Sequence, residues 1–86
     1  MDNSSSGIEV RYFAAAMDAA GIAIETVDLP HSATLSVLKA LLVDRHGAAM
    51  ARVLSVAAFI VDSELTRDLD RAVGPRIDVL PPFAGG

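Results

Sequence analysis

The chain of 86 residues is long enough for one small domain and leaves no room for a second. Its net charge of -4, from 7 Lys and Arg against 11 Asp and Glu, provides no basic footprint for nucleic acid. Cysteine is absent, which excludes disulfides, thiolate metal sites and a cysteine nucleophile. No apolar run reaches the roughly 18 residues of a membrane span. Residues 1–7 are polar and lack the pattern of a secretory signal, so we expect a disordered leader and a cytoplasmic protein.

The first part of the chain predicts two strands separated by a short helix. Residues 8–13 alternate apolar and polar side chains, which indicates a half-buried strand. Residues 14–20 are rich in alanine and predict a helical turn or two that ends at Gly21. Residues 22–27 are rich in β-branched side chains and predict the second strand.

The clearest helix of the sequence follows the second strand. Thr34 is its expected N-cap and Gly47 its expected end, with His46 suited to the negative pole of the last turn. Apolar residues recur between them at helical spacing: Leu35, Leu38, Leu41 and Leu42.

The second half of the chain predicts three strands. Residues 53–61 are a continuous apolar run, which indicates an interior strand. A turn at residues 62–63 leads into a short strand at residues 64–66. Residues 68–74 form a polar loop, and residues 76–80 alternate again as the last strand.

The order of these elements predicts an α+β fold. One main helix packed across a mixed sheet of about five strands is an economical way to bury the apolar faces of so short a chain. We therefore expect a ubiquitin-like β-grasp roll over residues 8–80, with a short helical insertion after the first strand. Residues 81–86 would form an extended tail.

Other patterns favour structural roles over chemistry. Ser36 and Lys39 match the S-x-x-K pattern of penicillin-recognising enzymes, but neither S-D-N nor K-T-G follows. His31 and His46 have no paired ligand nearby, which favours surface or cap positions. An acidic run lacks the glycine and terminal glutamate of a calcium loop, which favours a solvated face: Asp62, Glu64, Asp68 and Asp70. We expect no metal site and no autonomous active site.

The tail is the first of two features that point to function. It reads Pro81-Pro82-Phe83-Ala84-Gly85-Gly86. Two prolines should end the sheet and direct the chain outward, and six extended residues reach roughly 20 Å. The final glycines lack side chains, so the terminal carboxylate can enter a channel too narrow for other residues. The alternative is a frayed terminus, because chain ends are often disordered.

Strand parity gives the second feature. The first, short and last strands each place one large apolar residue on a face that otherwise carries polar side chains. These residues are Phe13, Leu65 and Leu80. If they converge, they form a docking patch that continues into Pro81 at the root of the tail. Alternatively, the strands bulge, or the segment 14–20 covers these side chains.

Two segments carry a resemblance to a known family. They are the start, Ile8-Glu9-Val10-Arg11-Tyr12-Phe13-Ala14, and the end, Asp78-Val79-Leu80-Pro81-Pro82-Phe83-Ala84-Gly85-Gly86. With the helix between them, residues 8–86 resemble the small, sulfur-carrier subunit of molybdopterin synthase, a ubiquitin-like sulfur carrier. The helical insertion after the first strand distinguishes the chain from the shorter thiamin sulfur carriers.

The resemblance implies a non-catalytic, sulfur-donating subunit of a sulfurtransferase complex in molybdenum cofactor biosynthesis. A ubiquitin-activator-like enzyme, which itself binds ATP and Mg²⁺, would adenylate Gly86, and a sulfur donor protein would convert it to a thiocarboxylate. The tail residues Phe83, Ala84 and Gly85 would then carry it into the large subunit. There it would donate sulfur to the cyclic pyranopterin precursor. The resemblance also implies a heterotetramer with two large subunits, and no cofactor on this chain.

Two other kinds of function stay open. One is a ubiquitin-like sulfur carrier for another pathway, such as thiamin, cysteine or tungsten cofactor synthesis. The other is a ubiquitin-like binding module whose tail is never activated, or a modifier conjugated to protein lysines.

Overall fold

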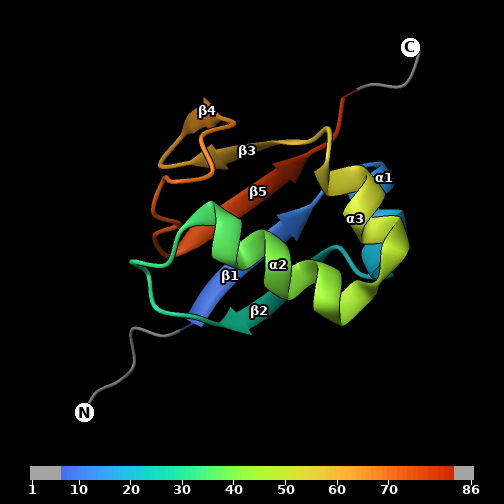
Figure 1. Cartoon of the computed structure of the whole chain (residues 1–86), viewed down its shortest axis with the longest axis horizontal. Coiled ribbons are helices and arrows are strands. Elements are labelled where there is room, and N and C mark those ends of the chain that lie inside the picture. The colour runs from blue at the N-terminus through green and yellow to red at the C-terminus, as the bar shows by residue number, and fades with distance from the viewer. Residues whose placement is uncertain (1–6, 83–86) are drawn as a thin grey trace.

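The computed structural model describes residues 7–82, which form a five-stranded sheet with three helices (Figure 1). The strands lie in the order β2-β1-β5-β3-β4. Their bounds are Gly7–Tyr12 for β1, Ile24–Asp28 for β2, Ala58–Val61 for β3, Glu64–Thr66 for β4 and Arg76–Leu80 for β5. The central strands β1 and β5 are parallel and the other neighbouring pairs are antiparallel, so the predicted mixed sheet is confirmed.

The helices lie over one face of the sheet and at one of its ends. Helix α2 (Leu35–His46) crosses the face in front of the central strands, as Figure 1 shows. Helices α1 (Ala15–Ala20) and α3 (Ala48–Leu54) pack together at the end of the sheet where β5 leads into the tail. We call the face beneath α2 the inner face and the opposite face the outer face.

The core lies between the inner face and the helices. Apolar residues alternate along β1, β3 and β5, so these strands turn buried apolar side chains towards the helices, and β2 adds Val27. Side chains that are completely or almost completely buried make up this layer: Ile8, Val10, Val27, Leu35, Leu38, Leu42, Met50, Phe59, Val61, Val73, Ile77 and Val79. A single contiguous core of this kind is what stabilises a domain of this size.

One predicted element is wrong in part. Residues 53–61 do not form one strand, because helix α3 extends to Leu54 and β3 begins only at Ala58. Alanine is the strongest helix former, and residues 48–51 contain three alanines. Met50 and Leu54 lie one helical turn apart and are both buried, which fixes the helix against the core. A continuous apolar run does not distinguish a strand from a buried helix, so the pattern could not predict where α3 ends and β3 begins.

The expected ends of α2 are confirmed. The Thr34 hydroxyl accepts a hydrogen bond from the Val37 amide at 3.3 Å, which is an N-cap contact. Gly47 ends the helix with a φ of 87°, and its amide donates to the Val43 carbonyl. Smaller shifts occur elsewhere: Gly7, expected in the leader, is the first residue of β1, and β2 starts at Ile24 rather than Ile22.

Candidate functional site

The register of the sheet aligns one residue from each strand in a row across the outer face. In strand order from β4 to β2 the row is Leu65, Ile60, Asp78, Arg11 and Ile24. A second row, nearer the tail, pairs Leu80 with Ala58. The outer face therefore combines exposed apolar residues with a charged centre.

The apolar part of this face contains the three residues that strand parity selected. Phe13 is 39% exposed and Leu65 is 66% exposed, while Leu80 and Pro81 are half-buried. Leu65 and Leu80 have the outer-face parity of β4 and β5, and Phe13 lies one residue beyond the end of β1. Helix α1 does not remove Phe13 or Leu65 from solvent. We call Phe13, Ile60, Leu65 and Leu80 the apolar patch. Exposed apolar groups gathered on one face are typical of protein docking surfaces, and the docking role itself stays a prediction.

A bidentate ion pair lies at the centre of the outer face. Arg11 Nε donates to Asp78 Oδ1 at 2.7 Å, and its terminal nitrogen donates to Asp78 Oδ2 at 2.8 Å. The hydrogen bond and the charge of the Asp78 carboxylate raise the pKa of Arg11. The Arg11 guanidinium also lies 5.8 Å from the centroid of the Phe13 ring. Arg11 thus connects the apolar patch to the charged centre.

Strand parity is the one sequence signal for this ion pair, and it is not sufficient to predict it. Arg11 and Asp78 share the strand parity of Phe13 and Leu80 and carry opposite charges. Only the parallel pairing of β1 with β5 sets them opposite each other, and residues 67 positions apart give no local sign of that pairing.

The outer face is hollowed at the end away from the tail. Arg76 Nε donates to Glu9 Oε1 at 2.9 Å there, beside the Arg11 ion pair. A cavity of about 440 Å³ is lined by these groups and by the β3–β4 turn: Glu9, Arg11, Ile60, Asp62, Ser63, Pro75, Arg76 and Asp78. The charged groups near the start of β5 line this hollow together with Ile60, and Leu80 lies at the other end of β5, where the tail begins.

The tail residues selected from the sequence lie outside the described residues. These are Phe83, Ala84, Gly85 and Gly86. Strand β5 ends at Leu80 as expected, and Pro81 and Pro82 continue the chain without donating to the sheet. The structure therefore places the root of the tail beside the apolar patch.

A buried polar cluster joins β1 and β2 to the end of α2, and no sequence pattern predicted it. The Glu25 carboxylate accepts hydrogen bonds from the Tyr12 hydroxyl and from an Arg45 nitrogen at 3.0 Å. His46 Nε2 lies 2.5 Å from Glu25 Oε2, the same oxygen that accepts from Tyr12, and Arg45 donates to Oε1. The Glu25 side chain is only 10% exposed. His46, expected at a helix cap, thus closes one side of this Glu25 cluster.

The cluster changes the pKa of two of its members. Burial raises the pKa of Tyr12, and the hydrogen bond to Glu25 adds to that effect. Burial also acts to raise the pKa of Glu25, but the hydrogen bonds from Tyr12, His46 and Arg45 outweigh it and lower the pKa. All polar groups of the cluster have partners, so its geometry fits a structural role better than proton transfer.

The remaining candidates show ordinary contacts. His31 Nε2 lies 3.0 Å from the Gly7 carbonyl oxygen, at the surface. Among residues 7–82 no group of three or more His, Asp or Glu side chains could hold a metal ion. Over the same range no helix is both long and apolar enough to span a membrane.

The fold has counterparts among solved structures. The crystal structure of small archaeal modifier protein 1 (SAMP1) from Haloferax volcanii matches with a TM-score of 0.75 and 26% identity, covering 93% of this chain and 99% of that one. A Pyrococcus furiosus protein described as molybdopterin converting factor, subunit 1, matches with a TM-score of 0.70 and 21% identity, covering 92% and 100%. No family model matches the sequence, and no curated protein matches it either.

These matches show the class of fold. The chain has the ubiquitin-like β-grasp fold, as its five-stranded mixed sheet and crossing helix predicted. The small archaeal modifier protein and the molybdopterin converting factor subunit share this fold.

Proposed function

We propose that this chain is the sulfur-carrier subunit of molybdopterin synthase in molybdenum cofactor biosynthesis. The outer face would dock on two partners in turn, through Phe13, Leu65, Leu80 and Pro81. One partner is an ATP-dependent adenylating enzyme and the other is the large subunit, with which it forms a heterotetramer. The neighbour described as molybdopterin converting factor, subunit 1, supports the pathway.

The chemistry falls on the terminal carboxylate of Gly86. Its oxygen attacks the α-phosphorus of ATP in the adenylating enzyme, pyrophosphate leaves, and an acyl-adenylate forms. Sulfur at the oxidation level of sulfide, supplied by a donor protein, then displaces AMP and leaves a thiocarboxylate. ATP and Mg²⁺ belong to the partner. Because this chain has no cysteine, it has no thiol that could hold the sulfur instead.

One observation carries the proposal. A tail that ends in Gly85-Gly86 follows directly on Leu80 at the end of β5, and Leu80 belongs to the apolar patch. A partner bound to the patch would therefore have the tail within reach. Glycine at the last two positions lets the carboxylate enter a narrow channel, because no side chain widens the tail.

Intact-mass measurement of the chain, expressed with its native activating partner, tests the proposal. We expect a species heavier by the difference between sulfur and oxygen, located at Gly86 by fragmentation. One residue added after Gly86 should abolish this species, because the reactive carboxylate becomes a peptide bond. Gly85→Val should strongly reduce it, because a β-branched side chain widens the tail. A plain carboxylate in the presence of the activator, or normal sulfur transfer by the extended chain, contradicts the proposal.

A protein modifier is the second candidate, and the match to small archaeal modifier protein 1 favours it. In that case the activated Gly86 carbonyl is attacked by a lysine amine of another protein, and an isopeptide bond forms as AMP leaves. The same expression experiment separates the two functions. Conjugates that carry the Gly85-Gly86 remnant on lysines support the modifier, and a thiocarboxylate without such conjugates supports the sulfur carrier.

A further inference from the structure

We propose that the tail has a docking groove on its own domain, in which Phe83 inserts between α1 and α3 while the Gly86 carboxylate pairs with Arg52. The inference concerns the resting state of the isolated chain. The contact itself needs neither an activating enzyme nor sulfur, whereas its release by a partner rests on the proposed function.

The groove lies where the two short helices meet the end of β5. It has a volume of about 510 Å³ and a mainly apolar lining of small side chains and prolines: Ala15, Ala19, Ala49, Val53, Val56, Pro81 and Pro82. Val56 is 52% exposed. Cavities of roughly 300 to 1,000 Å³ are the size in which proteins bind small organic groups. An aromatic ring is the kind of group that this lining accepts.

An aromatic residue follows the groove wall in the sequence. Pro82 forms part of the groove wall, and Phe83 is the next residue. Among the four residues beyond Pro82, Phe83 carries the only large side chain, since Ala84, Gly85 and Gly86 follow. Insertion of this ring would remove apolar surface of the ring and of the groove from water.

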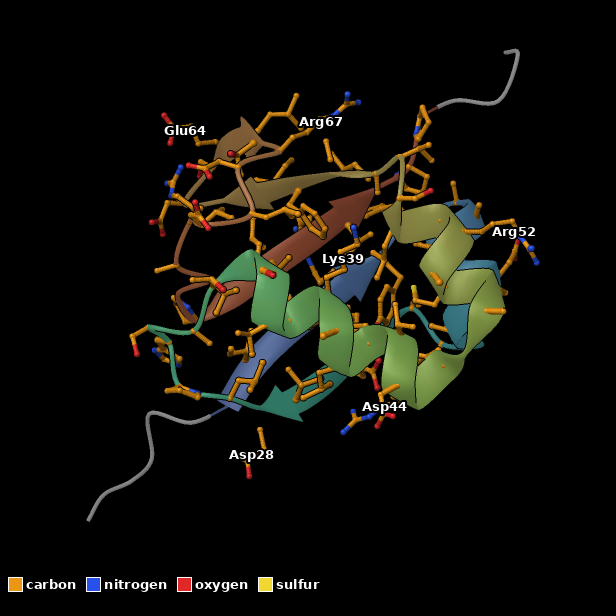
Figure 2. All side chains as sticks on the ribbon, in the orientation of Figure 1. Asp28, Lys39, Asp44, Arg52, Glu64 and Arg67 are labelled. Atoms are coloured by element: carbon orange, nitrogen blue, oxygen red, sulfur yellow. The ribbon has the colours of Figure 1, made fainter. Side chains whose placement is uncertain are left out.

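The second proposed contact joins the negative carboxylate at the end of the tail to the positive Arg52 side chain. Arg52 lines the groove and points outward from α3 in Figure 2. Within residues 7–82 it forms no ion pair, and Asp18 on the opposite wall does not reach it. Arg52 and Pro82 line the same groove, and the four residues from Phe83 to Gly86 span at most roughly 13 Å when extended.

The docked tail would withhold the Gly86 carboxylate from chemistry until a partner arrives. Pro81 belongs both to the groove wall and to the predicted docking surface on the outer face. A partner that binds the apolar patch and Pro81 would compete with the docked tail at this residue. Docking of the partner and release of the tail would therefore be coupled.

Methyl-resolved NMR of the isolated full chain tests the contact. With labelled alanine and valine methyl groups, we expect nuclear Overhauser effects between the Phe83 ring and the methyl groups of Val53 and Val56. Phe83→Ala should remove the ring-current shifts of these methyl groups, whereas Phe13→Ala should leave them unchanged. Methyl shifts that are identical in the full chain and Phe83→Ala overturn the proposal. Shifts that vary with protein concentration also overturn it, in favour of a second copy as the occupant.

Digestion by a carboxypeptidase gives a second readout with the tail sequence intact. Val56→Asp and Arg52→Gln should each speed the release of Gly86 several-fold, because they weaken the two ends of the contact. Val37→Asp is the matched control, since Val37 is 48% exposed on α2 and lies outside the groove. Melting curves establish that each variant is folded. Equal release rates for the parent chain, Val56→Asp and Arg52→Gln contradict the docked tail and leave the proposed sulfur chemistry untouched.

Discussion

A phenylalanine has a different environment on each of the two faces of the sheet. Phe59 on the inner face is 1% exposed and packs in the core beneath the helices. Phe13, beside the outer face, is 39% exposed and has the Arg11 guanidinium against its ring. Burial of an aromatic side chain within the domain stabilises the fold, whereas an exposed one contributes its apolar area only when a partner covers it.

The polar groups of the two faces differ in the same sense. The Glu25 carboxylate is enclosed between strands and helix and has three side-chain partners. The Arg11–Asp78 pair faces solvent on one side, with the Arg11 side chain 40% exposed. Inner-face residues should therefore determine stability, and outer-face residues should determine association.

Phe59→Ala and Phe13→Ala give the largest test of this difference. We expect Phe59→Ala to lower the free energy of unfolding by about 3–5 kcal/mol, because it leaves a cavity in the core. Phe13→Ala should change it by less than about 1 kcal/mol, as exposed substitutions do. Urea denaturation of both variants measures the two values. A loss of several kcal/mol for Phe13→Ala would show that this side chain belongs to the core and would remove the docking argument.

Association should show the reverse order for the outer face. Truncation of a central apolar anchor typically costs about 1–4 kcal/mol of binding. Phe13→Ala should therefore weaken binding to the adenylating enzyme and to the large subunit by something like ten- to a thousand-fold. Calorimetry with each partner measures this, and the two partners should compete for the parent chain. Unchanged affinity for both, in a folded variant, would leave the outer face without a docking role.

The elements that the sequence predicts well have a local cause. Alternation along residues 8–13 and 76–80 identifies both central strands, because a period of two requires only neighbouring residues. The same parity is enough to set Phe13, Leu65 and Leu80 on one face. Helix α3 was not predicted, because an apolar segment buried by tertiary packing lacks the periodicity that distinguishes a helix from a strand.

Contacts between segments that lie far apart in the sequence cannot be predicted from local patterns. The Arg11–Asp78 pair depends on which strands become neighbours. The Glu25 cluster combines residues of β1, β2 and α2 whose sequence neighbourhoods give no reason to pair them. The groove between α1 and α3 was not predicted either, because the apolar pattern did not predict α3.

Removal of the Glu25 carboxylate should have an intermediate effect on stability. Glu25→Ala leaves the buried Tyr12 hydroxyl and the His46 ring without their partner, and an unsatisfied buried polar group costs about 1–3 kcal/mol. The matched control is Glu64→Ala, whose carboxylate is 69% exposed and pairs with Arg71 at 2.8 Å. An exposed ion pair contributes about 0–1 kcal/mol. Equal losses for the two variants would show that burial of the cluster has no energetic consequence.

The Glu25 cluster also predicts a direction of pH dependence. The folded state lowers the pKa of Glu25, so its stabilising effect is fully present above the unfolded pKa of about 4.3. The effect is lost as the pH falls through the lower pKa of the folded state, where the carboxylate binds a proton. The stability difference between the parent chain and Glu25→Ala should therefore shrink on acidification below about pH 4. A difference that is constant from neutral pH to pH 3 would contradict this assignment.

The smallest predicted effect lies at the turn that joins the outer-face Phe13 to helix α1. Ala14 has φ 53° and ψ -127°, and the Ala16 amide donates to the Phe13 carbonyl at 3.0 Å. This is the first central position of a type II′ turn, where glycine is favoured because a Cβ is strained at positive φ. Such strain costs about 1–3 kcal/mol, while a new glycine adds about 0.4–1 kcal/mol of unfolded-state entropy to be lost on folding.

Ala14→Gly should therefore stabilise the fold by about 1 kcal/mol, which raises Tm by roughly 4–8 °C in a domain of this size. Gly21→Ala, at φ 77° with open space around a Cβ, should shift Tm by a similar amount in the opposite direction. Shifts of the same sign in the two melting curves would contradict the strain at Ala14.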